Sequence, residues 1–226
     1  MGKVEPLFHI KLFGYNIGIA QSILGQWVII VFVAIACIYF TRNLKIIPSK
    51  KQNIIEIIVS SINNLVRDNM GEDYMSFVPF IGTIAVFLVF MNLTGLVGIN
   101  APTADYSVAL ALALITFFVV QWFAIKKIGL GHYFKGYAKP YFFILPINLI
   151  ERVMLPVSLS FRLFGNMTAA VVIMDLTYRS LGSLTGFAQL VIPIPLHFYF
   201  DLFDGIIQMV IFVMLTMVNI KVIAEH

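Results

Sequence analysis

The sequence predicts an all-α integral membrane protein with about five membrane helices and one amphipathic surface helix, the last two membrane helices being long and steeply tilted as a hairpin. Three observations lead to this fold class. The 226 residues are 60% hydrophobic and 12% charged, whereas an ordinary soluble domain carries about 25% charged residues. Charge-free runs long enough to cross a bilayer recur along the chain, and Lys and Arg cluster between them. A soluble enzyme and a disordered chain are thereby excluded, because a folded core of this size cannot hide so much apolar surface from water.

We treat residues 1–226 as a single membrane domain that begins with an outer N-terminal segment, 1–23, and a first span, 24–41. A cleaved signal peptide is the competing interpretation of this apolar run. The run is too long and too far from the start for a signal peptide, and no small-residue cleavage site follows it. Cys37 lies within the run and, as the one cysteine, excludes a disulfide framework. We expect it to be a small buried hydrophobe.

Residues 52–70 have the pattern of an amphipathic helix that lies along the membrane surface. Ile54, Ile58 and Leu65 recur at helical spacing, while Glu56 and Arg67 belong to the polar side. The competing interpretation is a polar helix within a loop.

Two further spans follow, at 74–97 and 106–125, and the distribution of Lys and Arg sets their orientation. The connections 42–51 and 126–139 hold four Lys or Arg each, whereas 97–105 holds none. By the positive-inside rule, the two basic connections are cytoplasmic. We therefore expect the N-terminus outside and the C-terminus in the cytoplasm.

The last two segments, 141–179 and 184–223, are longer than a bilayer requires. Residues 141–178 alone would be roughly 57 Å long as a helix, and a hydrocarbon core of about 30 Å needs only about 20 residues. Both segments also carry charges at membrane depth, unlike the earlier spans. We therefore expect helices that tilt steeply, break or overhang, with kinks permitted at Pro146, Pro156, Pro193 and Pro195.

Arg162 lies near the middle of its segment, too far from either end for its side chain to reach the interface. An arginine inside the membrane costs from about 2.5 to over 10 kcal/mol by different estimates, so it needs a partner or a wet cavity. One interpretation is a functional group. The other is a structural ion pair with Glu151, Asp175 or Asp201.

The neighbours of Arg162 favour the functional interpretation. Ordinary helix packing explains each small residue singly, but together they form a smooth face that lets another helix approach closely in lipid. On a regular helix, the residues within roughly 60° of Arg162 are Ser158, Gly165, Asn166 and Ala169.

A second stripe of polar residues lies in the last segment. His197, Asp201, Asp204 and Gln208 follow one another at i, i+4, i+7 and i+11, and so share one face of a regular helix. Such groups along an apolar helix suggest a wetted proton path. The alternatives are an interfacial anchor and a metal pair, and one imidazole with one carboxylate makes a poor metal site. Asp175 could face this stripe, because an antiparallel hairpin brings it near.

Other polar positions have simpler interpretations. Glu151, near the cytoplasmic end of its segment, is either an interfacial anchor or part of an exit path. We expect helix–helix hydrogen bonds from Asn92 and Gln121, which lie within spans. The sequence has no phosphate-binding Gly-rich loop, no paired zinc histidines and no nucleophile elbow. We therefore expect no cofactor, no metal and no covalent catalysis by the chain alone, and without a basic aromatic stripe we expect no nucleic-acid partner.

Several stretches carry a resemblance to a known family. The stretch from Pro156 to Met167, PVSLSFRLFGNM, strongly resembles the signature of subunit a of bacterial F-type ATP synthases. The stretch from Gln208 to Thr216, QMVIFVMLT, is similar to that family's last helix. Phe90 to Leu93 and Pro102 to Asp105 also look like family landmarks, and the similarity spans nearly the whole chain.

The resemblance implies an ion-conducting stator beside a rotating ring of c subunits. In the family, two offset half-channels and an essential arginine exchange H⁺ or Na⁺ with ring carboxylates. The arginine, a polar residue one turn later and a last-helix glutamine match Arg162, Asn166 and Gln208. The implied partners are the c ring, the b subunits of the peripheral stalk, the rest of the ATP synthase and the lipid bilayer. The implied place is the inner (plasma) membrane of a bacterium, and the chain would be non-catalytic by itself.

One departure from the family concerns the outer half-channel. Many members have Gly-Glu where this chain has Ala170-Val171, and valine cannot titrate. Asp175 lies one turn further along the same face, and we expect it to substitute. It would form the outer path together with His197, Asp201 and Asp204. The alternative functions are a proton-coupled secondary transporter, which usually shows repeated halves that are not visible here, and an intramembrane hydrolase, for which a nucleophile or metal motif is missing. The choice between H⁺ and Na⁺ stays open.

Overall fold

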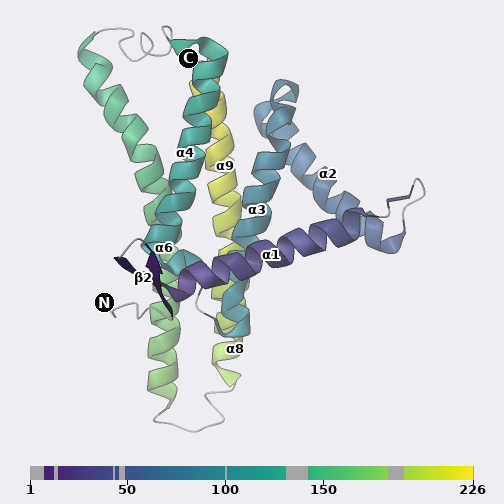
Figure 1. Cartoon of the computed structure of the whole chain (residues 1–226), viewed down its shortest axis with the longest axis vertical. Coiled ribbons are helices and arrows are strands. Elements are labelled where there is room, and N and C mark those ends of the chain that lie inside the picture. Colours follow the sequence, from purple (N-terminus) through teal and green to yellow (C-terminus); the bar gives the residue numbers. More distant parts are fainter. Residues whose placement is uncertain are drawn as a thin grey trace.

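The structure is a computed structural model, and almost all of its described residues are helical (Figure 1). It describes residues 8–12, 15–42, 44–45, 49–99, 101–130, 142–182 and 191–225. By length and composition, five helical segments of the described chain could cross a membrane, which confirms the predicted fold class. They are Gln21–Thr41, Glu72–Val97, Tyr106–Ile128, Leu145–Leu181 and Pro193–Ile223.

A short β-hairpin near the N-terminus is the only strand pairing among the described residues. Strand β1 (Phe8–Leu12) pairs antiparallel with β2 (Tyr15–Ile19), with Phe8 opposite Ile19. The sequence FHIKL alternates apolar and polar residues with the period of two that is typical of a strand. The hairpin was not among the predicted elements, because five residues of alternation are inconspicuous beside long apolar runs.

Helix α1 (Gln21–Thr41) crosses the other long helices at a steep angle instead of running beside them (Figure 1). The Ser22 hydroxyl donates to the Asp105 carboxylate over 2.7 Å, and the rings of Phe32 and Phe90 meet edge to face at 5.6 Å. Because of this crossing, α1 and the remaining long helices cannot all lie along one membrane normal.

The expectation that Cys37 is buried is wrong, because its side chain is exposed. Within α1 only Ile29 is buried among the described residues. Lipid tails are about as apolar as leucine, so an apolar membrane helix gains little from being covered by protein. The apolar run that contains Cys37 therefore faces outward.

Helix α2 (Lys50–Met70) is the most amphipathic of the long helices. The Ser49 side chain caps its start and Gly71, at φ +100°, follows its end. Ile54 in the first half is 61% exposed, whereas Val66 in the second half is fully buried. The second half packs on the bundle and the first half offers its apolar side chains to the surroundings.

The remaining helices form the bundle that holds the core. Its largest helix contacts are those of α4 with α6, α3 with α9 and α4 with α9. Ile81, Leu88 and Met91 meet Val213 and Met217 in this core, and all five are fully buried. The elements are η1 (Glu72–Phe77), α3 (Val78–Leu93), η2 (Thr94–Val97), η3 (Pro102–Ala104), α4 (Tyr106–Ile128), η4 (Phe142–Ile144), α6 (Leu145–Leu181), α8 (Pro193–His197), the π-helix η5 (Phe198–Asp204) and α9 (Gly205–Glu225).

Helix α6 and the run from α8 to α9 lie antiparallel, as the hairpin prediction required (Figure 1). α6 has 37 residues, or about 55 Å, and continues as α-helix through Pro156. Pro146, Pro193 and Pro195 lie instead in first turns, where a missing N–H costs nothing. The connection between the two arms lies outside the described residues.

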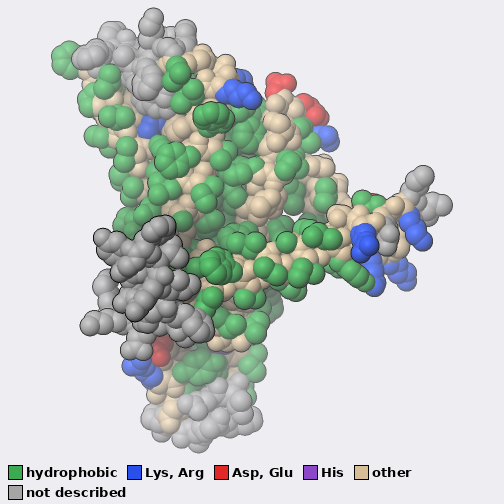
Figure 2. Space-filling model, in the orientation of Figure 1, with side chains coloured by type: hydrophobic (Ala, Val, Ile, Leu, Met, Phe, Trp, Pro, Cys, Tyr) green, Lys and Arg blue, Asp and Glu red, His purple; other side chains and the backbone are tan. Residues whose placement is uncertain are grey.

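The surface of the molecule matches its apolar composition. Figure 2 shows hydrophobic side chains over most of the visible face. Lys and Arg gather at the tip where α1 ends and α2 begins. The exposed basic residues of this tip are Arg42, Lys45, Lys50 and Lys51.

Candidate functional site

The predicted smooth face of α6 is a face that the described part of the chain leaves uncovered. Ser158, Arg162, Gly165 and Ala169 are all exposed, and Asn166 beside them is half-buried. The other side of α6 packs into the molecule through Leu159, Leu163, Met167 and Ala170, none more than 5% exposed. Among the described atoms, nothing lies within 4 Å of where a Cβ would sit on Gly165. A second helix could therefore approach this face closely.

Arg162 forms no ion pair in the described part of the chain. Each acid that could have neutralised it has another arrangement. Asp175 pairs with Arg179, Asp201 pairs with His197, and Glu151 is exposed three turns earlier on α6. The described side chains therefore do not form the internal ion pair that was the alternative interpretation of Arg162.

Gln208, the first residue of the second similar stretch (Gln208 to Thr216), lies beside Arg162. It is 4% exposed, and its side chain and Arg162 line the same shallow depression between α6 and α9. The other lining residues are Leu159, Leu163 and Phe212. The walls are apolar, so the guanidinium and the amide are the polar groups of this depression.

The polar stripe does not lie on one regular α-helix, because His197 ends α8 whereas Asp201 and Asp204 lie on the π-helix η5. A π-turn closes i→i+5 hydrogen bonds and so fits more residues into each turn, and such turns occur frequently at functional sites. The faces expected from 100° per residue therefore do not hold across η5. His197, Asp201 and Asp204 are half-buried.

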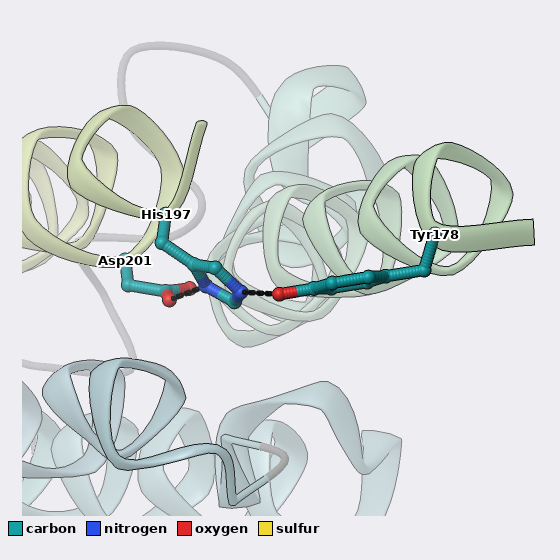
Figure 3. Close-up of polar contacts among 3 residues, drawn as sticks. All are labelled: Tyr178, His197 and Asp201. Atoms are coloured by element: carbon teal, nitrogen blue, oxygen red, sulfur yellow. Dashed lines mark hydrogen bonds and ion pairs between the residues drawn. The ribbon is translucent and has the colours of Figure 1, made fainter. Parts of the chain in front are cut away.

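Three side chains of this region form a hydrogen-bonded row (Figure 3). His197 Nδ1 contacts the Asp201 carboxylate, and His197 Nε2 lies 3.0 Å from the Tyr178 hydroxyl of α6. A carboxylate can only accept, so Nδ1–H donates to Asp201 and, in a neutral ring, Nε2 accepts from the tyrosine. The row leads from exposed Tyr178 to Asp201, whose side chain is 13% exposed.

Asp175 does not reach this row among the described contacts. Its carboxylate forms two contacts with Arg179, of 2.8 and 3.1 Å. Both side chains are largely exposed, at 55% and 76%. Tyr178, three residues after Asp175, takes the place in the hairpin that we expected for the acid.

The end of α3 supports η5 from the other side. The Asn92 amide donates to the Gly205 carbonyl over 2.9 Å, which confirms the predicted helix–helix hydrogen bond. Gly95, one turn later, lies so close to the Asp201 carboxylate that a Cβ there would overlap it. The described residues include no group of three or more metal-ligating His, Cys, Asp or Glu side chains.

Sequence reasoning missed Tyr178, Arg179 and Gly95. Arg179 follows Asp175 at i+4, a spacing that puts two side chains on one helix face, so this pair had a readable signal. Tyr178 and Gly95 had none, because their partners lie in other elements and only the fold brings them together.

Comparison with known proteins identifies a family. A family model described as ATP synthase A chain matches residues 23–221. ATP synthase subunit a 2 of a Bradyrhizobium species is 35% identical, over 95% of this chain and 91% of that protein. The sodium ion specific ATP synthase subunit a of Propionigenium modestum is 31% identical, over 92% of this chain and 75% of its own length. The chloroplastic ATP synthase subunit a of Stigeoclonium helveticum is 33% identical, over 92% and 90%.

The close approach of Gly95 and Asp201 predicts a coupled pair of mutations. Gly95→Ala should lower the free energy of unfolding in detergent by about 1 kcal/mol or more, because the added methyl group overpacks against a carboxylate that His197 holds in place. In an Asp201→Ala background the same change should cost little, giving a large coupling energy. Gly165→Ala, which has open space around its Cβ, is the matched control. Equal costs with and without Asp201 would show that the two residues do not meet.

Proposed function

The chain belongs to the ATP synthase A chain family, and from this premise we propose that it is the ion-conducting stator subunit of a rotary ATP synthase. It provides two half-channels and an essential arginine that exchange ions with carboxylates of a c ring, and it couples ion flow to rotation. The chain is a multi-pass membrane component of that complex. It has no catalytic role by itself.

The observation that carries this proposal is that Arg162 is exposed without an ion-pair partner among the described residues. Its guanidinium is exposed on a face of small residues, without an ion-pair partner in the described part of the chain. A charge in lipid requires neutralisation or water. An acid on a neighbouring protein that passes this face would supply the missing charge.

The mechanism is electrostatic. A ring carboxylate surrounded by lipid favours its neutral, ion-loaded form, because its charged form loses hydration there. Beside Arg162 the charged form is favoured, so the ion leaves into one half-channel. After rotation the carboxylate reloads from the other half-channel. The driving force is about 2.3 kcal/mol per charge per 100 mV.

Arg162 also separates the two half-channels. A fixed positive charge between them repels a cation that would otherwise pass without turning the ring. Gln208, which lines the same depression, offers a neutral amide beside the guanidinium. Asn166, one turn along α6 and half-buried, extends the polar part of the face.

The outer half-channel is assigned to Asp175, His197, Asp201 and Asp204. The row of Tyr178, His197 and Asp201 supports this assignment, since it joins an exposed hydroxyl to a mostly buried carboxylate. Val171 leaves a gap in the family's usual acid position, and Asp175 supplies an exposed carboxylate one turn further on. Glu151, exposed near the other end of α6, belongs to the inner side.

The remaining parts of the proposal follow from charge and geometry. The basic tip between α1 and α2 is cytoplasmic, which puts the N-terminus outside and the C-terminus inside, in the plasma membrane of a bacterium. Since α1 crosses the bundle steeply, a first helix along the membrane normal leaves α6 and α9 strongly tilted, in position to follow a ring.

The b subunits of the peripheral stalk are further partners. A secondary transporter is not favoured by the family.

We expect Arg162→Ala to reduce ion-driven ATP synthesis by the assembled complex in vesicles to background, because the ring carboxylate loses its counter-charge. Arg162→Lys should also fail, since lysine lacks the planar, always-charged fork. Arg67→Ala, which removes an exposed pair with Glu72 on the other side of the bundle, is the control. Coupled synthesis at a wild-type rate in the Arg162→Ala complex would refute the role.

The outer path predicts separate effects of four neutral substitutions of similar size, Asp175→Asn, His197→Gln, Asp201→Asn and Asp204→Asn. At least one should slow ion-driven ATP synthesis, and we expect Asp201→Asn to slow it most because that carboxylate is the least exposed end of the row. The measurement is the synthesis rate at a fixed ion gradient. If all four complexes work at the wild-type rate, the assignment is wrong.

A further inference from the structure

The carboxyl-terminal end of η5 rests on a buried hydrogen-bond chain. Asn92 Nδ2 donates to the Gly205 carbonyl over 2.9 Å, and Thr103 Oγ1 donates to Asn92 Oδ1 over 2.9 Å. Asn92 is 1% exposed and Thr103 is fully buried. Thr103 of η3 thus orients the Asn92 amide, while the amide holds Gly205, the first residue of α9.

Gly205 is the residue at which the π-helix passes into α9. A backbone carbonyl has two lone pairs, so this one can take a side-chain donor in addition to its place in the helix. A Cβ on Gly205 would lie 3.0 Å from the Asn92 Cβ. The glycine therefore permits the close approach that the hydrogen bond needs.

A second contact comes from the same end of α3. Gly95, three residues after Asn92, leaves the space that the Asp201 carboxylate occupies. Asn92 holds the backbone at the end of the π-helix, and Gly95 admits the acid at its middle. The junction of α3 and η2 therefore makes two contacts about one helical turn apart, one with Asp201 in η5 and one with Gly205 at the start of α9.

We infer that Asn92, oriented by Thr103, is a positioning residue that fixes the π-helix and so sets the direction in which Asp201 and Asp204 point. The inference rests on the proposed function, because it concerns the acids of the outer path. Asn92 itself touches no ion in this role. It acts through the Gly205 carbonyl, and its loss lets η5 relax toward a regular α-helix, which rotates the acids away from their places.

The charged and titratable groups around η5 come from three elements. Tyr199 and Asp204 belong to η5 itself, and His197 ends the preceding helix α8. Tyr178 comes from α6, with the Asp175–Arg179 pair beside it. The packed parts of α3 and η2 contribute none. A change in ion dependence after substitution of Asn92 therefore reports a movement of these groups and not the loss of a charge.

The test uses Asn92→Leu in the assembled ATP synthase in vesicles. Outer proton concentration is varied at constant sodium, then outer sodium at constant pH, and the ion that drives synthesis in the wild-type complex is the one titrated. A net hydrogen bond corresponds to a change of roughly two- to tenfold. We expect the half-saturating outer ion concentration to shift by about threefold or more, which a merely structural role would not produce.

Thr103 supplies the milder pair of variants. Thr103→Val removes the hydroxyl that orients the amide and should shift the half-saturating concentration in the same direction, whereas Thr103→Ser keeps the hydroxyl and should restore it. If Asn92→Leu fails to assemble, this pair decides the question. Asn69→Leu is the matched control, because the Asn69 amide also donates to a backbone carbonyl, that of Leu65, but within α2.

Two results would overturn the inference. One is a wild-type half-saturating concentration in both Asn92→Leu and Thr103→Val. The other is a loss of assembled complex with unchanged ion dependence in what remains. Either result, combined with an inactive Arg162→Ala complex, would leave the proposed function intact. An active Arg162→Ala complex would refute the proposed function instead, whatever Asn92→Leu does.

Discussion

A guanidinium without an ion-pair partner among the described residues, on the uncovered face of a membrane helix, is the constraint on which the whole arrangement depends. Lipid cannot solvate Arg162, and the carboxylates of Asp175 and Asp201 pair with other side chains. The charge is therefore stable only with water or with a group from another protein beside it. The small residues around it, such as Gly165, keep that space open. The fold as a whole holds one charge without a counter-charge among the described residues, and in the proposed mechanism each passing ring carboxylate would supply that counter-charge.

The rest of the chain supplies rigidity on both sides of that charge. The buried side of α6 packs through Leu159 and Leu163, so the exposed side cannot roll inward to hide Arg162. On the returning arm, the end of α3 holds the π-helix that carries Asp201. Irregular backbone inside a membrane persists only where protein or water satisfies it. Asn92 meets this requirement at Gly205, and on the account proposed above this hydrogen bond sets the direction of the acids on η5.

The sequence predicted the elements well and the contacts between them poorly, for physical reasons. Long apolar runs fix where membrane helices lie, and a motif of twelve residues around Arg162 was specific enough to indicate the family. Burial was harder to predict, and Cys37 was assigned to a core because soluble proteins bury such residues, although lipid removes that rule. We expected the polar stripe on a regular helix, whereas Asp201 and Asp204 lie on the π-helix η5. No residue pattern in the sequence indicates a π-helix there. Tyr178 reached His197 only through the tertiary fold.

The most direct measurement is disulfide cross-linking from the uncovered face of α6 in the assembled complex. The native cysteine is exposed, so Cys37→Ser is the starting background, and a cysteine is placed on the outer helix of the c ring beside its carboxylate. Gly165→Cys should cross-link to the ring. Val153→Cys, also exposed but about half a turn around the helix from Arg162, should not. Efficient cross-linking from Val153→Cys and none from Gly165→Cys would mean that the guanidinium faces away from the ring, which would contradict the account.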